Sequence, residues 1–125
     1  MRSLIIALII LATVVSTTVI GAFLTDRRLE KFKNQIELAI PSESRDTVKI
    51  SEGAKQIEEE YKSLRKFIIL FIHDDGVREI EEHISDIKSA AEADELSDAI
   101  IAKSRLILHI EQLRRLSKFS SEAIF

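Results

Sequence analysis

The segment richest in groups that could do chemistry is "FIHDDGVREIEEH", residues 71–83. It brings together His73, Asp74, Asp75, Glu79 and His83. Imidazole and carboxylate groups this close in sequence could ligate a divalent metal ion or act as a general acid and base. The same residue types also occur where one helix ends and the next begins.

The junction between two helices is the favoured interpretation. His73 follows an apolar helical pattern and can donate to the last carbonyl groups of that helix. Asp74 or Asp75 can accept backbone N–H groups at the start of the next helix, and Gly76 eases the reversal of the chain. In this interpretation each residue of "HDDG" helps to turn the chain.

Catalysis and zinc binding are less well supported. Metal-dependent phosphohydrolases of the His-Asp type need further His and Asp ligands on separate helices, and this chain has three His in all. A zinc pair on one helix needs His at i and i+4, and the chain has no Cys for a thiolate site or nucleophile. The sequence therefore predicts no enzymatic activity and no cofactor.

One arrangement could still bind a cation or sense pH. If the helices on either side of a turn near residue 93 are antiparallel, His109 returns to the end of the bundle that holds His73 and Asp74. A helix rise of about 1.5 Å and an axis separation of about 8–10 Å would then put His73 within ~12 Å of His109. Histidine titrates near physiological pH. These three residues are therefore the candidate metal ligands.

A long apolar run occupies the N-terminus. Ser3 to Leu24, "SLIIALIILATVVSTTVIGAFL", carries no charged residue. As a helix it would be about 33 Å long, enough for a hydrocarbon layer of about 30 Å. Val14-Val15-Ser16 could serve as a signal-peptide cleavage site, but the run continues for two further turns, so an uncleaved anchor is expected over residues 1–24. Within it, Thr13, Thr17 and Gly21 form a small-residue ridge that would let another membrane helix approach closely.

The charges around this run give opposite indications of topology. Arg27, Arg28, Lys31 and Lys33 follow the run, whereas Arg2 precedes it, and this count places the C-terminal part in the cytoplasm. A short basic head before an apolar run is, however, the layout of a signal anchor. We therefore expect the C-terminal part on the outer face of the cytoplasmic membrane.

The remaining chain reads as helices. An apolar pattern over 25–40 predicts an amphipathic continuation of the anchor that stops before Pro41. Residues 41–53 read as a polar hinge, in which Ser42 or Ser51 could cap the following helix. Three further amphipathic patterns over 54–125 predict a three-helix bundle with a short C-terminal tail, and Asp94 is the expected N-cap of the last helix. The fold class is thus all-α, an N-terminal transmembrane helix continuing into a small antiparallel bundle. The predicted core includes Ile57, Leu64, Ile68, Ile84, Ile110 and Leu113.

With its N-terminal anchor, the "FIxH" of Phe71, Ile72 and His73, and the ending "SSEAIF", the chain resembles a family of short, uncharacterised membrane-anchored helical proteins of Gram-positive spore-forming bacteria. That family is grouped as a domain of unknown function. The resemblance covers nearly the whole chain and implies a membrane location and a helical architecture. It implies no activity.

The expected function is that of a membrane-anchored scaffold or protein-interaction module. The alternative is a membrane-anchored sensor that responds to a ligand, a cation or pH. Its partners would be the lipid bilayer and another membrane or envelope protein, with a second copy of the chain as an alternative. Nucleic acid is not an expected partner, since 18 basic residues are outnumbered by 21 acidic ones.

Overall fold

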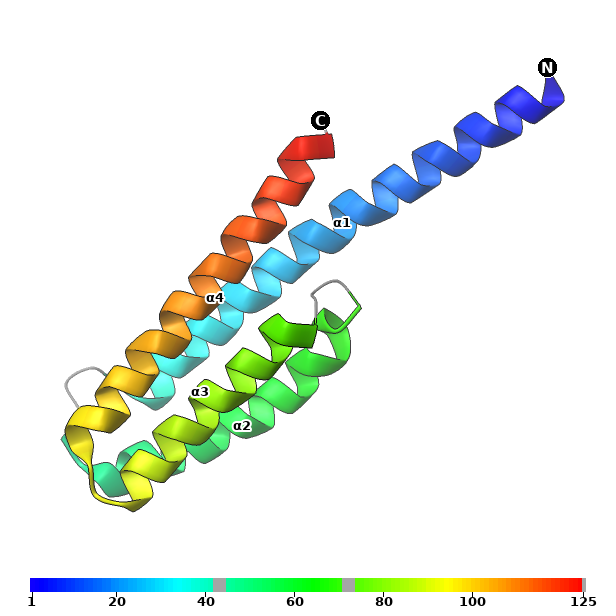
Figure 1. The fold of residues 1–125 in the computed structure, drawn as a ribbon. Helices are drawn as coiled ribbons and strands as arrows, with labels where there is room; N and C mark the ends of the chain where they lie inside the picture. Colours follow the sequence, from blue (N-terminus) through cyan, green and yellow to red (C-terminus); the bar gives the residue numbers. More distant parts are fainter. Residues whose placement is uncertain (42–44, 71–73, 125) are drawn as a thin grey trace.

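The computed structural model describes residues 1–41, 45–70 and 74–124, with residues 74 and 117–124 described by their backbone alone. The described chain is all-α, which confirms the predicted fold class. Four helices follow one another: α1 (Arg2–Ala39), α2 (Thr47–Ile68), α3 (Asp74–Glu92) and α4 (Leu96–Ile124). Each runs antiparallel to the next, and α4 returns alongside α1, so the four close into a ring (Figure 1).

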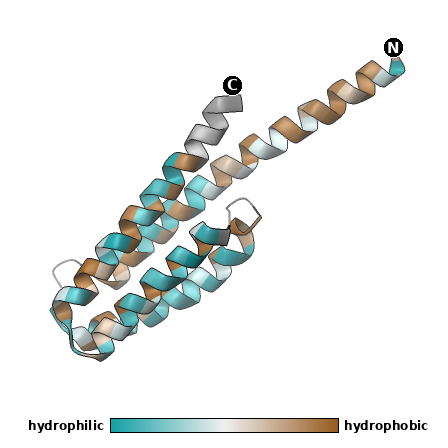
Figure 2. Ribbon diagram, viewed as in Figure 1, coloured by the Kyte–Doolittle hydropathy of each residue, from teal (hydrophilic) through white to brown (hydrophobic). Residues whose placement is uncertain are grey.

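α1 is a single uninterrupted helix of 38 residues with two different surroundings. Its first half extends beyond the other helices and is apolar, while its second half lies against α2 and α4 (Figures 1 and 2). In that second half Leu29, Phe32 and Ile36 recur at helical spacing and are buried. The prediction of a three-helix bundle over 54–125 is therefore wrong. Residues 25–40 form the fourth wall of the bundle, because their apolar stripe needs a partner.

α2 begins earlier than the sequence pattern indicates. The predicted hinge over 41–53 is too long, since α2 starts at Thr47. Asp46, rather than Ser42 or Ser51, caps the helix by accepting the backbone N–H of Val48 at 3.0 Å. Ser51 lies within the helix, and Ser42 lies outside the described residues. Gly53 allows a close approach of α2 to α1, because a Cβ there would collide with the carbonyl group of Ala39.

In the connection between α3 and α4, Asp94 terminates α3 and does not cap the start of α4. Asp94 has a φ of 58°, the left-handed conformation of a helix C-terminus. Its N–H donates to Ala91 at 3.2 Å, and the N–H of Glu95 donates to Ala90 at 2.9 Å, which is the hydrogen-bond pattern of a Schellman motif. The prediction of Asp94 as the N-cap of α4 is wrong. Its carboxylate instead accepts a hydrogen bond from the hydroxyl of Thr47 at 2.6 Å.

The core lies on the common axis of the four helices. All six predicted core residues are buried: Ile57, Leu64, Ile68, Ile84, Ile110 and Leu113. Tyr61 crosses from α2 to α3, and its hydroxyl donates to the carbonyl of Val77 at 3.0 Å. Its ring lies 6.0 Å from that of Phe32 on α1, so one side chain joins three helices.

Candidate functional site

The structure describes one of the three candidate metal ligands completely. His109 is buried on α4 and faces the start of α3. Its Nε2 lies 3.0 Å from the carbonyl oxygen of Gly76, and its Nδ1 lies 3.0 Å from Oε2 of Glu79. These contacts agree with the antiparallel register that the sequence predicts around residue 93. His73 and the side chain of Asp74 lie outside the described residues, so their predicted proximity to His109 stays a prediction.

His109 has acceptors on both ring nitrogens. A neutral imidazole carries one N–H and can donate to one of them, whereas an imidazolium donates to both. His83 lies beside it, with ring centroids 5.8 Å apart, and within the described structure its buried Nδ1 has no hydrogen-bond partner. Two histidines and a carboxylate thus meet where α3 packs on α4. No group of three or more residues able to hold a metal ion is found among the described residues.

The first half of α1 has the exposure of a helix that lies outside the protein core. Of the helices in the described ranges, α1 alone is long and apolar enough to cross a membrane, and 6% of its most apolar window is buried. A core helix of a soluble protein would be mostly buried, so the chain has one long apolar N-terminal helix with the character of a membrane anchor or signal sequence.

The predicted small-residue ridge divides between two environments. Thr13 and Thr17 are exposed, and their hydroxyls each donate at 2.8 Å to the carbonyl four residues earlier. Such bonds satisfy a hydroxyl within a helix in a lipid environment. Gly21 is buried and continues the stripe that faces the bundle, together with Thr25 and Leu29.

An ion network joins α4 to the part of α1 that directly follows the apolar run. Nε of Arg114 donates to Oδ1 of Asp26 at 2.9 Å, and its Nη1 donates to Oε1 of Glu111 at 3.0 Å. Lys33 reaches the same oxygen of Glu111 at 2.9 Å. The hydrogen bond from Lys33 is the main cause that lowers the pKa of Glu111, with a further contribution from Arg114. Burial works to lower the pKa of Arg114, but Asp26 and Glu111 raise it overall, so the guanidinium stays charged.

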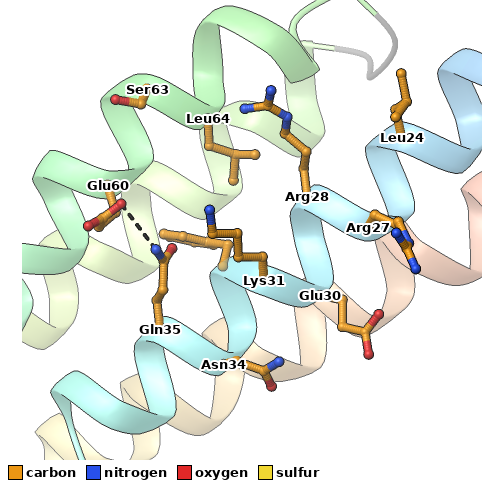
Figure 3. Close-up of a pocket in the computed structure, with 11 residues that line it drawn as sticks. Leu24, Arg27, Arg28, Glu30, Lys31, Asn34, Gln35, Glu60, Ser63 and Leu64 are labelled. Atoms are coloured by element: carbon orange, nitrogen blue, oxygen red, sulfur yellow. Dashed lines mark hydrogen bonds between the residues drawn. The ribbon is translucent and has the colours of Figure 1, made fainter.

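An open groove of about 640 Å³ lies between α1 and α2, beside the same turns of α1 that carry the ion network (Figure 3). Leu24, the last residue of the apolar run, lies at one end of it, and Phe32 and Leu64 contribute apolar side chains. The remaining lining is mostly polar or charged: Arg27, Arg28, Glu30, Lys31, Asn34, Gln35, Glu60 and Ser63. Figure 3 shows Arg28 and Lys31 extending from α1 toward α2, while Arg27 and Glu30 point away from α2.

The two arginines of this groove contact aromatic rings, whereas the cations of the ion network contact carboxylates. The guanidinium of Arg28 lies over the ring of Phe67 at 4.6 Å, and that of Arg27 lies over Phe23 at 5.3 Å. Among the residues that the structure describes, no carboxylate lies within ion-pair distance of Arg27, Arg28 or Lys31. An aromatic face positions a cation without neutralising it. The groove lining therefore has a net positive charge, with three basic residues against the two acidic residues Glu30 and Glu60.

Sequence reasoning predicted the helix junction but missed the groove and the ion network. Both features depend on residues 25–40 being a wall of the bundle. The signal that could have found them is the buried stripe of Leu29, Phe32 and Ile36, which has to face other helices. Comparisons with protein-family models, curated proteins and solved structures find no match to this chain.

Proposed function

We propose that the chain is a single-pass membrane protein whose first helix anchors a four-helix interaction module at the membrane surface. The observation that carries the proposal is the continuity of α1, which is apolar and exposed in its first half and buried in the bundle in its second. A helix without a break cannot let the bundle swing freely. The bundle is therefore held at a fixed height and orientation against the bilayer, as suits a scaffold that positions a partner.

A row of exposed apolar side chains supports binding of a protein partner. Ile101, Leu108 and Leu116 lie about two turns apart on α4, and each is exposed. Apolar residues that recur on one helix face provide a surface for another helix. The partner we propose is another membrane or envelope protein. A second copy of this chain is the alternative, and crosslinking distinguishes the two by the mass of the product.

Membrane insertion and topology can be tested with single cysteines, because the chain has none of its own. Ser89 is exposed on α3, and Thr17 is exposed in the apolar half of α1. With the bundle outside, a membrane-impermeant maleimide labels Ser89→Cys in intact cells and leaves Thr17→Cys unlabelled until detergent is added. Labelling of Ser89→Cys only after lysis would place the bundle in the cytoplasm, as the charge count suggests. A soluble product beginning near Thr17 would contradict the anchor itself.

The interaction can be tested by site-specific photo-crosslinking in native membranes. A photoreactive residue at Leu108 should capture a partner, whereas one at Lys55, on the exposed face of α2, serves as the matched control. Equal adducts at both positions, or none at Leu108, would contradict a partner surface on α4.

A pH-responsive sensor is the second candidate, and the geometry of His109 favours it. Its ring can donate to both acceptors on α3 at the same time only when it is protonated. If the partner is captured at one pH and released at another, between about 5.5 and 7.5, and if His109→Gln abolishes that difference, the sensor is supported. Capture that is independent of pH supports the scaffold.

A further inference from the structure

We propose that the groove between α1 and α2 binds the phosphate of an anionic phospholipid, held by Arg28 and Lys31. This inference rests on the proposed membrane anchoring and adds a ligand to it. Both side chains extend toward α2 across the groove, and Leu24 marks its membrane end (Figure 3).

The depth of the two cations matches that of lipid headgroups. Arg28 follows Leu24 by one helical turn, about 6 Å, and Lys31 by about 10 Å. The polar layer on each side of the hydrocarbon core is about 5–7 Å thick. A lysine side chain can extend its ammonium group by several ångströms toward the phosphates. Both charges therefore reach the layer in which phosphate groups lie.

The charge of the groove is available to an incoming anion. Arg28 is positioned by Phe67 and not by a carboxylate. The lining holds two acidic residues against three basic ones: Glu30 lies 3.6 Å from Arg114, and Glu60 accepts a hydrogen bond from Gln35 at 3.2 Å, which leaves a net positive charge. An arginine fork and a lysine ammonium are the groups that recognise phosphate most often in proteins.

A second observation indicates that this end of the bundle faces lipid. α2 ends at Ile68, one residue beyond Phe67, and the next two side chains are apolar and exposed: Ile69 by 42% and Leu70 by 74%. Because Phe67 contacts Arg28, these two residues lie near the level where α1 leaves the apolar run. Exposed Ile and Leu at that height are stable in contact with acyl chains. A lipid in the groove would thus have its phosphate on Arg28 and Lys31 and apolar neighbours beside it.

The test uses the full chain reconstituted in vesicles of equal phosphatidylcholine and phosphatidylglycerol. After mild detergent extraction, native mass spectrometry counts the lipids that remain bound. We expect the wild type to retain phosphatidylglycerol preferentially. In the double variant Arg28→Gln, Lys31→Gln that preference should fall at least about tenfold, since a single hydrogen bond to a charged group is worth about tenfold or more.

The matched control is the double variant Lys66→Gln, Arg115→Gln. It removes the same charge, but Lys66, beside Phe67 on α2, and Arg115, beside Arg114 on α4, are exposed and lie outside the groove lining. A groove site predicts that the control keeps its preference. An equal loss in both double variants would mean diffuse attraction and would overturn the proposal, as would a wild type without preference. If excess inorganic phosphate displaces the lipid from the wild type, the ligand is a soluble phosphate and the lipid assignment is wrong.

Flotation of the vesicles separates this proposal from the proposed function. A chain that floats with pure phosphatidylcholine vesicles but shows no lipid preference is anchored and lacks the headgroup site. A chain that does not float with vesicles of either composition is not anchored, and both proposals fail.

Discussion

Asp26 and Arg114 are 88 positions apart in sequence and are joined by a hydrogen bond of 2.9 Å. Both side chains are mostly buried, and the bond connects the second half of α4 to the turn of α1 that follows the apolar run. Glu111 and Lys33 extend the contact by one turn away from the apolar run. This network holds α4 against α1 where the apolar half of α1 meets the bundle.

Loss of Arg114 should destabilise the bundle more than loss of any exposed ion pair. Arg114→Ala leaves the mostly buried carboxylate of Asp26 without its charged partner and Glu111 with Lys33 alone, and we expect a cost of about 2–3 kcal/mol in the free energy of unfolding. The control is Lys62→Ala, which breaks an exposed pair with Glu59 and should cost under about 1 kcal/mol. Urea titration of the full chain in detergent, followed by circular dichroism, measures both. Equal effects would contradict the network.

The core is tested by two neighbouring positions of α4. Ile110 is fully buried, whereas Leu108 is 56% exposed. Ile110→Ala should cost about 2–5 kcal/mol because it removes buried methyl groups and leaves a cavity. Leu108→Ala should leave stability nearly unchanged, and Leu64→Ala on α2 should behave like Ile110→Ala. A large loss from Leu108→Ala would mean that α4 is rotated relative to the structure.

Acid should weaken the contact between α1 and α4. Lys33 and Arg114 lower the pKa of Glu111, so the folded chain holds this carboxylate ionised more strongly than the unfolded chain does. Its contribution is therefore complete above the ordinary glutamate pKa of about 4.3 and is lost as pH falls through the lowered value in the folded protein. In urea titrations at successively lower pH, Glu111→Gln should start less stable than the wild type at neutral pH and show a smaller loss on acidification. Parallel curves would contradict the prediction.

Tyr61 should titrate above the ordinary tyrosine range. Burial, together with the charge of Glu81, raises its pKa, although Arg65 opposes the shift. Its stabilising contribution is present below the ordinary value of about 10 and is lost as pH rises through the raised value. Tyr61 is the single tyrosine and the chain has no tryptophan, so tyrosinate absorbance reports on this residue alone. Ionisation near pH 10 in the folded state would contradict its burial.

The hydrogen bond of Tyr61 can be measured separately. Tyr61→Phe removes the donor to Val77 and keeps the ring against Phe32, so we expect a loss of about 0.5–1.5 kcal/mol in the free energy of unfolding. Tyr61→Leu should cost more, since it also removes the aromatic contact. If Tyr61→Phe cost as much as Tyr61→Leu, the hydroxyl would account for the whole effect.

Helix identity and the buried faces could be predicted from the sequence because they follow from local periodicity. Leu64 and Ile110 recur at helical spacing within long amphipathic patterns, and both are buried as expected. Helix ends were predicted less well. Asp46 and Asp94 are both acidic residues beside a helix, yet Asp46 caps the start of α2 while Asp94 adopts a positive φ after the end of α3. Composition alone does not distinguish these two roles.

The groove could not be predicted, because it depends on the packing of segments distant in sequence. Arg28 and Phe67 are on different helices, and their contact requires the second half of α1 to be a wall of the bundle. Proximity to the apolar run made Arg28 and Lys31 resemble ordinary flanking charges of a membrane span. Only the arrangement of α1 against α2 distinguishes them from Arg27.

The pairing of α1 with α4 also constrains the order in which the protein can be made. The ring of helices is closed by α1 and α4, and α1 leaves the ribosome before α4 does. Until α4 has been synthesised, part of the apolar surface of Leu29, Phe32 and Ile36 therefore stays exposed. Under the proposed anchoring, α1 is inserted in the bilayer during that interval, before α4 covers this stripe. The proposed anchoring thus implies that the bundle is completed after membrane insertion, and a nascent chain stalled before α4 would leave this stripe exposed to proteases and chaperones.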